Sequence, residues 1–320
     1  MATITRAVDT VRSNSAFAVR VLAISLLVGF LMSTFWSAEF VDQEIGNSWS
    51  DSILGGDASE MEIGSVGLGF FYALVTGFAG TFTACNICAF SAIAPLAGEK
   101  RTVGKVLTPL LYLSAGLIAV AAIYGAIGAI LGEGHLQLNQ TRLGDPETGI
   151  RVRSLQSMAV FGSIGIIFIL WGMMSIGLVR NPFAGVAARY PWARSVFMGA
   201  LIGGFLIGRP FGLFRHMFEF AAATHNPAVG ALSFVLQGLG NIIIMVVLFL
   251  FLVYGTGGRF ERWLHAKPGR IQTVTATALI IGGTFFFTYW VPRLLARNGL
   301  FYWPFWDWDT LKLMFIRIPS

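Results

Sequence analysis

The chain has 320 residues, of which 55% are hydrophobic and 12% charged, and its formal net charge is +6. A soluble globular chain has roughly 25% charged residues, so this composition indicates an integral membrane protein with little room for a soluble domain. The basic residues lie in short clusters between apolar runs, as in cytoplasmic loops, and nucleic acid is not an expected partner. The sequence has no Gly-rich phosphate loop, HExxH motif or paired-carboxylate motif, which argues against a soluble-type hydrolase or nucleotide enzyme.

Seven apolar runs are long enough to cross a bilayer as tilted helices, which takes about 20 residues. They are residues 17–36, 66–96, 107–131, 157–179, 196–224, 227–254 and 272–292. The first run is expected to be a retained signal anchor rather than a cleaved signal peptide, because the bulky Phe35 and Trp36 follow it in place of a small-residue cleavage site. The sequence therefore predicts an all-α integral membrane protein with about seven transmembrane helices.

The loops between these runs differ in charge. Residues 37–63 hold seven carboxylates and no Lys or Arg, whereas basic clusters follow the second, fourth and sixth runs. The positive-inside rule then places the N-terminus in the cytoplasm and the C-terminus outside, although Arg142, Arg151 and Arg153 fall on the predicted outer side. We expect the protein in the cytoplasmic (inner) membrane, in contact with lipid, and in a prokaryote.

Without the anchor, six helices remain in two halves, 66–179 and 196–292, which enter the membrane from opposite sides. This is the arrangement of a 3+3 inverted repeat, whose sites lie near the midplane between the repeats. The halves open with similar Gly-punctuated stretches, "GFAGTFTACNIC" (77–88) and "GGFLIGRPFGLF" (203–214), and Pro210 is expected to break the fifth helix. The predicted regions are an anchor with an acidic outer loop (1–63), a six-helix membrane domain (64–297) and an aromatic tail (298–320).

Both cysteines of the chain, Cys85 and Cys88, lie three residues apart in the second run. A Cys-x-x-Cys pair can act as a dithiol, bind a metal or simply pack. On a regular helix the two Cβ atoms lie about 5–6 Å apart, farther than the roughly 3.8 Å of a relaxed disulfide. A disulfide here would therefore be strained unless the helix unwinds. Two thiolates also provide half of an iron–sulfur site, and free cysteine is commonly buried as a small apolar residue.

Several charged or titratable residues fall inside the fifth run. Such residues are costly in a membrane and usually face a cavity or a partner. Arg209, Arg215 and Glu219 can supply a positive field near Pro210, but Arg215 and Glu219 are also one turn apart and can pair with each other. His216 and His225 are weak candidates for haem ligands. No cofactor is predicted from the residues, with haem or an iron–sulfur cluster as alternatives.

The C-terminal stretch "GLFYWPFWDWDTLKLMFIRIPS" (299–320) is dense in aromatic side chains. Aromatic residues concentrate at the membrane–water interface, and they also anchor protein interfaces. The tail is therefore expected either to lie along the membrane surface or to dock on a partner subunit.

The stretches "GFAGTFTACNICAFSAIAPLAG" (77–98) and "FEFAAATHNPAVGALSFVLQGLGNIII" (218–244) resemble the two halves of the CcdA/DsbD transmembrane family. That family consists of six-helix thiol–disulfide electron carriers involved in cytochrome c biogenesis, and the resemblance covers about residues 64–292. Its members place one redox cysteine in the first helix of each half, usually beside a proline. Here the second half reads Arg209-Pro210-Phe211, with the proline but no cysteine, so the usual dithiol between the halves cannot form.

The resemblance implies a transmembrane carrier that uses Cys85 and Cys88 as catalytic residues, with Arg209, Pro210 and Phe211 in support. It would pass reducing equivalents to an extracytoplasmic thioredoxin-like or other redox partner. The alternative is a non-redox accessory subunit of a larger membrane complex, which would keep the fold and contact other membrane subunits. A transporter is a third hypothesis, since inverted repeats are common among transporters.

Overall fold

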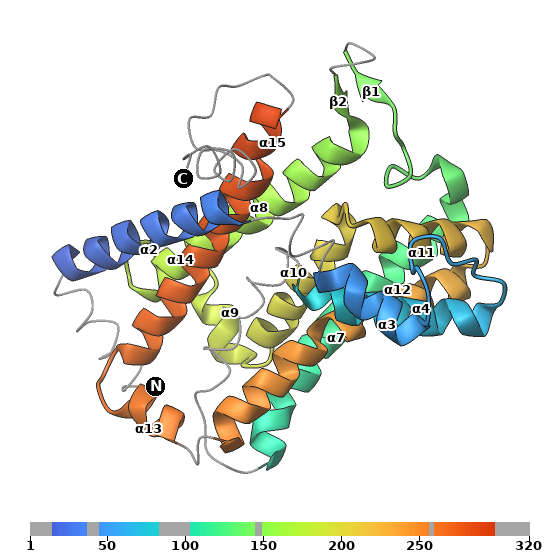
Figure 1. The fold of residues 1–320 in the computed structure, drawn as a ribbon. Helices are drawn as coiled ribbons and strands as arrows, with labels where there is room; N and C mark the ends of the chain where they lie inside the picture. Colours follow the sequence, from blue (N-terminus) through green and yellow to red (C-terminus); the bar gives the residue numbers. More distant parts are fainter. Residues whose placement is uncertain (1–14, 37–44, 83–102, 145–148, 256–258, 298–320) are drawn as a thin grey trace, which may run out of the picture.

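The computed structural model describes residues 15–36, 45–82, 103–144, 149–255 and 259–297 (Figure 1). The long helices are α2(Ser15–Phe35), α4(Val66–Ala79), α7(Val103–Leu131), α8(Val152–Ser175), α10(Ala193–Gly208), α11(Gly212–Ala223), α12(Pro227–Leu250) and α14(Arg270–Trp290). The short elements are α3(Ser48–Leu54), η2(Gly80–Phe82), η3(Gly132–Gly134), β1(Arg142–Leu143), β2(Ile150–Arg151), α9(Ala184–Arg189), η4(Phe251–Gly255), α13(Arg259–His265) and α15(Pro292–Arg297). Apart from the small antiparallel pair β1–β2, the described chain is helical, as expected for an all-α membrane protein.

Five helices of the described residues are long and apolar enough to cross a membrane. They are α2, α7, α8, α12 and α14. The pair α10 and α11 also passes this test when taken together, but the two helices meet at an angle of 87°. The apolar α4 is shorter, and the rest of the expected second span lies outside the described residues. The membrane character is therefore confirmed, and the count of seven spans stays a prediction.

Local sequence signals explain where several helices begin. Ser65 caps α4 by accepting a hydrogen bond from the backbone N–H of Leu68 at 3.3 Å. Asn226 caps α12 in the same way from the N–H of Ala228, and Pro227 occupies the first turn, where its missing N–H costs nothing. These caps fix the first residues of two of the helices that build the site.

Glycines bring the long helices into backbone contact along several seams, and we call three of them, α4–α12, α7–α10 and α8–α14, the glycine seams. At each of them a Cβ on the glycine would collide with backbone atoms of the facing helix. The approaches along these three seams are Gly77 to Gln237, Gly240 to Leu74 and Phe78, Gly199 to Leu113, Gly116 to Val196 and Ala200, and Gly165 with Gly283 to each other. Small residues at such contacts are the usual means of tight helix association in membranes.

Helix α2 lies beside α14 at the edge of the bundle (Figure 1). Thr288 donates a hydrogen bond from its hydroxyl to that of Ser33 at 2.7 Å, and Arg293 Nη1 donates to the carbonyl of Trp36 at 3.1 Å. The opposite face of α2 exposes apolar side chains such as Ile24 and Leu27. An apolar face of this kind is suited to lipid.

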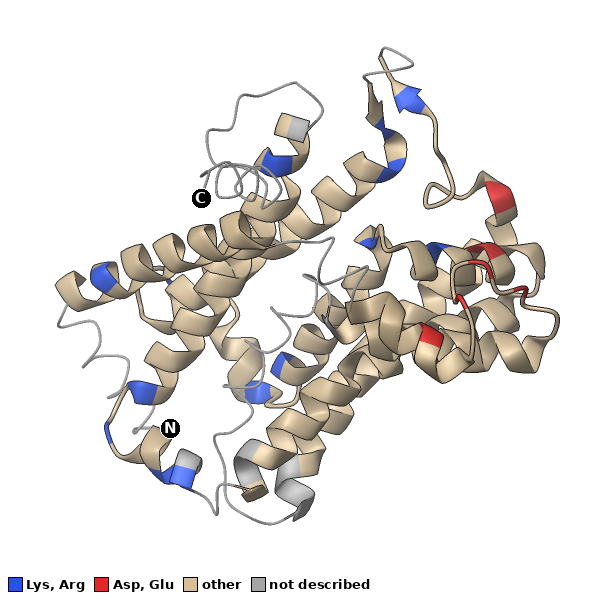
Figure 2. Cartoon of the chain, viewed as in Figure 1, with Lys and Arg blue, Asp and Glu red and all other residues tan. Residues whose placement is uncertain are grey.

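Charged residues are segregated in the fold (Figure 2). The loop between α3 and α4 carries Asp57, Glu60 and Glu62, and it lies near the end of the molecule where α11 is found. This loop is attached to the helices: the hydroxyl of Tyr72 donates to the carbonyl of Ala58 at 2.8 Å, and Ala58 itself is buried. The acidic segment is thus a packed cap over α4 and α11.

Candidate functional site

The fifth predicted span is broken where the sequence indicated. α10 ends at Gly208 and α11 begins at Gly212, so Arg209, Pro210 and Phe211 form a non-helical corner between two helices at 87°. Proline lacks a backbone N–H and its ring clashes with the preceding turn, which accounts for the break. The predicted interruption at Pro210 is confirmed, whereas its position relative to Cys85 stays a prediction.

Two glutamine side chains compensate for the carbonyl groups that the break releases. Gln156 Nε2 donates to the carbonyl of Ile207 at 2.7 Å, and Gln137 Nε2 donates to the carbonyl of Arg209 at 2.6 Å. Gln156 Nε2 also lies 3.2 Å from the hydroxyl of Tyr124. An unpaired carbonyl in an apolar environment costs several kcal/mol, so these contacts are needed for a break inside a membrane bundle.

The side chain of Arg209 is only 1% exposed and reaches across to two other elements. Its Nη2 donates to the carbonyl of Gly80 in η2 at 2.9 Å, and its Nη1 donates to Asn241 Oδ1 on α12 at 3.0 Å. The guanidinium carbon also lies 5.3 Å from the ring centroid of Phe211 and 5.9 Å from that of Phe214. Aromatic faces at these distances stabilise a cation, and the break therefore carries a fixed positive charge in the protein interior.

Gly80 is required for this arrangement, because a Cβ there would overlap the Arg209 guanidinium. The next residue, Thr81, donates from its hydroxyl to the carbonyl of Asn241 at 3.0 Å. η2 ends at Phe82, the last described residue before the segment that contains the cysteines. The buried cation is thus bound to the last described turn before that segment.

The predicted catalytic residues, Cys85 and Cys88, lie outside the described residues, as does the aromatic tail 298–320. The contacts and redox role of the two thiols stay predictions. What the structure provides is the environment at the start of their segment, namely Arg209, Gly80 and Asn241.

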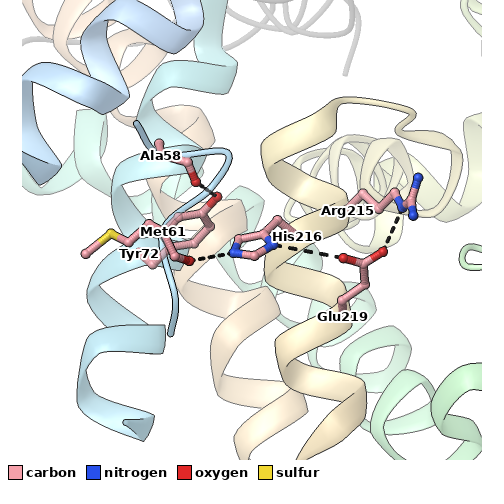
Figure 3. A network of polar contacts seen from close by, with 6 residues as sticks. All are labelled: Ala58, Met61, Tyr72, Arg215, His216 and Glu219. Atoms are coloured by element: carbon pink, nitrogen blue, oxygen red, sulfur yellow. Dashed lines mark hydrogen bonds and ion pairs between the residues drawn. The ribbon is translucent and has the colours of Figure 1, made fainter. Parts of the chain in front are cut away.

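Arg215, His216 and Glu219 lie on α11 itself, after the corner formed by residues 209–211 (Figure 3). Arg215 Nε lies 2.8 Å from Glu219 Oε1, and both side chains are about two-fifths exposed, at 40% and 42%. His216 Nε2 lies 2.8 Å from the carbonyl of Met61 in the acidic cap, and its Nδ1 lies 3.9 Å from Glu219 Oε2. Of the two interpretations left open by the sequence, these contacts favour an ion pair that satisfies itself over a field at Pro210.

The two histidines named as haem candidates are not arranged as a ligand pair. The nitrogens of His216 face Met61 and Glu219, and His225 is exposed, with a positive φ of 49°. Within the described ranges, no group of three His, Cys, Asp or Glu residues is assembled for a metal ion. A cofactor at the cysteines stays an untested alternative.

Sequence reasoning identified Arg209, Pro210 and Phe211 but not the residues that hold them. Gln137 and Gln156 lie near the ends of apolar runs, where an amide is unremarkable. Asn241 lies within the run 227–254, and a polar side chain at such a position is itself a signal of function. That signal was available in the sequence.

Comparison with protein-family models, with curated proteins and with solved structures gave no significant match to this chain.

Proposed function

We propose that the protein is a transmembrane thiol–disulfide carrier of the CcdA/DsbD type, with Cys85 and Cys88 as its redox pair. The observation that carries the proposal is the buried Arg209, held at a broken helix and bound to Gly80 on the turn that precedes the cysteine segment. Thiolates are the reactive form of cysteine, and a nearby cation favours them. A buried guanidinium is expensive in a membrane, so its placement at this point calls for a function.

In the proposed reaction, one thiolate of the pair attacks a disulfide of an extracytoplasmic partner, and the partner's leaving sulfur departs as a thiolate. The second cysteine then attacks the mixed disulfide. This step forms the Cys85–Cys88 disulfide and releases the partner as a dithiol. A dithiol reductant on the cytoplasmic side restores the pair by the same exchange in reverse. The partner's two sulfurs gain two electrons, and the cytoplasmic dithiol loses them.

An inverted repeat of 66–179 and 196–292 forms part of this proposal, and the glycine seams support it. In α4–α12 and α7–α10, corresponding residues make corresponding contacts: Gly77 faces the backbone of Gln237 as Gly199 faces that of Leu113. Each residue of α4 and η2 differs from its counterpart in α10 by the same number of positions along the chain. The residues of α7 differ from their counterparts in α12 by a second fixed number of positions. The first joins Gly77 to Gly199, Leu74 to Val196, Phe78 to Ala200 and Thr81 to Gly203, and the second joins Leu113 to Gln237, Gly116 to Gly240 and Leu117 to Asn241.

The interval that relates Gly77 to Gly199 also brings Cys88 into line with Pro210. The residue that breaks the second half thus corresponds to a cysteine in the first half. This correspondence supports the interpretation that the second half once had a redox cysteine at the position of Pro210 and has lost it. We also propose the orientation with the N-terminus in the cytoplasm and the acidic cap outside, in the inner membrane of a prokaryote.

The second candidate function is a non-redox accessory subunit built on the same fold. The observation that favours it is Arg209-Pro210-Phe211, where the second half has a buried arginine and no cysteine. In this case Arg209 is a structural clamp between α10, η2 and α12, and the two cysteines only pack.

A trapping experiment with the full-length chain in membranes distinguishes the two functions. Cys88→Ser leaves Cys85 unable to resolve a mixed disulfide, and Cys85→Ser does the same for Cys88. We expect one of these variants to accumulate a disulfide-linked adduct with an outer protein, which disappears on reduction and in the variant lacking both cysteines. Absence of an adduct from both variants, with both thiols unmodified under oxidising and reducing conditions, would contradict the carrier and favour the accessory subunit.

A further inference from the structure

His135 lies in the loop that follows η3, outside the membrane-spanning segments, yet it is only 6% exposed. Its ring packs against Tyr124 of α7 and Phe218 of α11, with centroid distances of 5.2 and 4.8 Å. A histidine enclosed by aromatic rings is disfavoured as a cation by the loss of water, unless a carboxylate compensates.

The hydrogen bonding of His135 fixes its protonation state. The backbone N–H of Gln137 donates to Nδ1 of His135 at 3.0 Å, so this nitrogen must be an unprotonated acceptor. The proton of the neutral ring is then on Nε2. A second proton could only be added at Nδ1, where it would point at the N–H of Gln137. Protonation therefore replaces a hydrogen bond with a contact between two donors.

The hydrogen bond to His135 positions Gln137, whose side chain binds a carbonyl group at the helix break. Gln137 is 1% exposed, and its side chain donates to the carbonyl of Arg209 at 2.6 Å. Arg209 in turn holds Gly80 and Asn241 through its guanidinium. One short chain of contacts thus runs from the His135 ring to the corner between α10 and α11.

We propose that His135 is a proton-sensitive positioning residue: its neutral ring holds Gln137 on the Arg209 carbonyl, and its protonation releases Gln137 and loosens the break between α10 and α11. The proposal rests on the described break and not on the thiol chemistry, so it stands or falls separately from the proposed function. It makes the geometry around Arg209 respond to the pH on the side of the membrane where His135 lies.

The surroundings of His135 agree with this behaviour. The titratable or charged groups near it on the elements that pack around it are Tyr124 on α7, Glu133 in η3, the group Arg215, His216 and Glu219 on α11, and His225, whose ring lies close to Gly132. Burial lowers the pKa of His135 below its usual value. The neutral form is thus the one adapted to the fold, and the folded state binds the proton less readily than the unfolded chain.

Two variants separate the acceptor from the ring. His135→Asn retains an acceptor, because an Asn oxygen can bond to the N–H two residues on, and it does not titrate. His135→Phe keeps an aromatic ring in the pocket but has no acceptor. His135 has no role in the proposed thiol chemistry, and both variants can be made in the full-length chain.

The measurement is hydrogen exchange of the backbone amides around residues 207–214 in lipid nanodiscs, corrected for the intrinsic effect of pH. Between about pH 8 and about pH 4, a range that extends below ordinary histidine titration because burial lowers the pKa of His135, protection in the wild type should fall about tenfold, the effect of one buried hydrogen bond. His135→Phe should be poorly protected at both pH values and His135→Asn well protected at both. Amides of the α8–α14 seam serve as the internal reference and should not change. Wild-type protection that is independent of pH, or a His135→Phe variant as protected as the wild type, overturns the proposal.

Discussion

The glycine seams and the helix break hold the same bundle together by opposite means. At the α7–α10 seam, Gly199 and Gly116 place backbone against backbone, so shape alone determines the contact. At the break, backbone carbonyls lack helical partners instead, and the side chains of Gln137 and Gln156, from distant parts of the chain, bind them. The guanidinium of Arg209 in turn binds the carbonyl of Gly80 in η2. The comparison indicates that the seams provide rigidity, while the break concentrates polar chemistry where small changes in charge or hydrogen bonding have an effect.

The largest effect is expected at a seam. In Gly199→Ala, the added methyl group would overlap the carbonyl oxygen of Leu113. Backbone cannot move aside without separating α10 from α7, so we expect a loss of about 3 kcal/mol or more in the free energy of unfolding. Denaturant or thermal unfolding of the purified protein in detergent measures this loss.

Gly204→Ala is the matched control, because Gly204 lies on the same helix and a Cβ there meets only Ile164 Cδ1 at 3.5 Å. That contact is ordinary, and alanine is a better helix former than glycine by about 1 kcal/mol. The control should therefore be neutral or slightly stabilising. Equal losses in the two variants would show that the seam is not closely packed.

At the break, we expect a smaller but still clear effect from Asn241→Leu. The change removes the oxygen that accepts from Arg209 Nη1 inside the protein, and losing a partner of a buried charged group costs about 2 kcal/mol. Asn241→Asp keeps an acceptor and should retain most of the stability. If Asn241→Leu unfolds at the same temperature as the wild type, the hydrogen bond between Arg209 and Asn241 contributes nothing to the fold.

A third test concerns the carbonyl of Ile207. Gln156→Leu leaves it without its amide donor, and we expect a loss of about 1–2 kcal/mol. Ser157→Ala, at the next position, removes a hydroxyl that bonds only within its own helix, to the carbonyl of Arg153, and should have little effect. Unfolding of the two variants side by side shows whether the break depends on the amide or merely on packing along α8.

The sequence predicted the parts of this comparison that depend on neighbouring residues. Pro210 indicated the break, the spacing of Arg215 and Glu219 indicated their pairing, and apolar runs located the long helices. It did not predict that Gln137 would reach the Arg209 carbonyl or that Asn241 would accept from its side chain. Those contacts join residues far apart in the chain, and their partners are set by how α7, α8 and α12 pack. The arrangement of Cys85 and Cys88 is untested because they lie outside the described residues.

The smallest effect is expected at the surface of α11, where the pair Arg215 and Glu219 is two-fifths exposed. Glu219→Gln removes the charge but keeps the shape, and exposed ion pairs contribute about 0–1 kcal/mol. Because both side chains are partly exposed, the free energy of unfolding should change by less than about 0.5 kcal/mol, and the difference should shrink further in high salt. The unfolding measurement used for Asn241→Leu tests this prediction.

A loss as large as that of Asn241→Leu would mean that Glu219 acts through His216 on the acidic cap, to which His216 is bound at Met61. In that case His216→Ala should reproduce the loss, whereas Arg215→Ala should not, because Arg215 contacts only Glu219 among the described ion pairs.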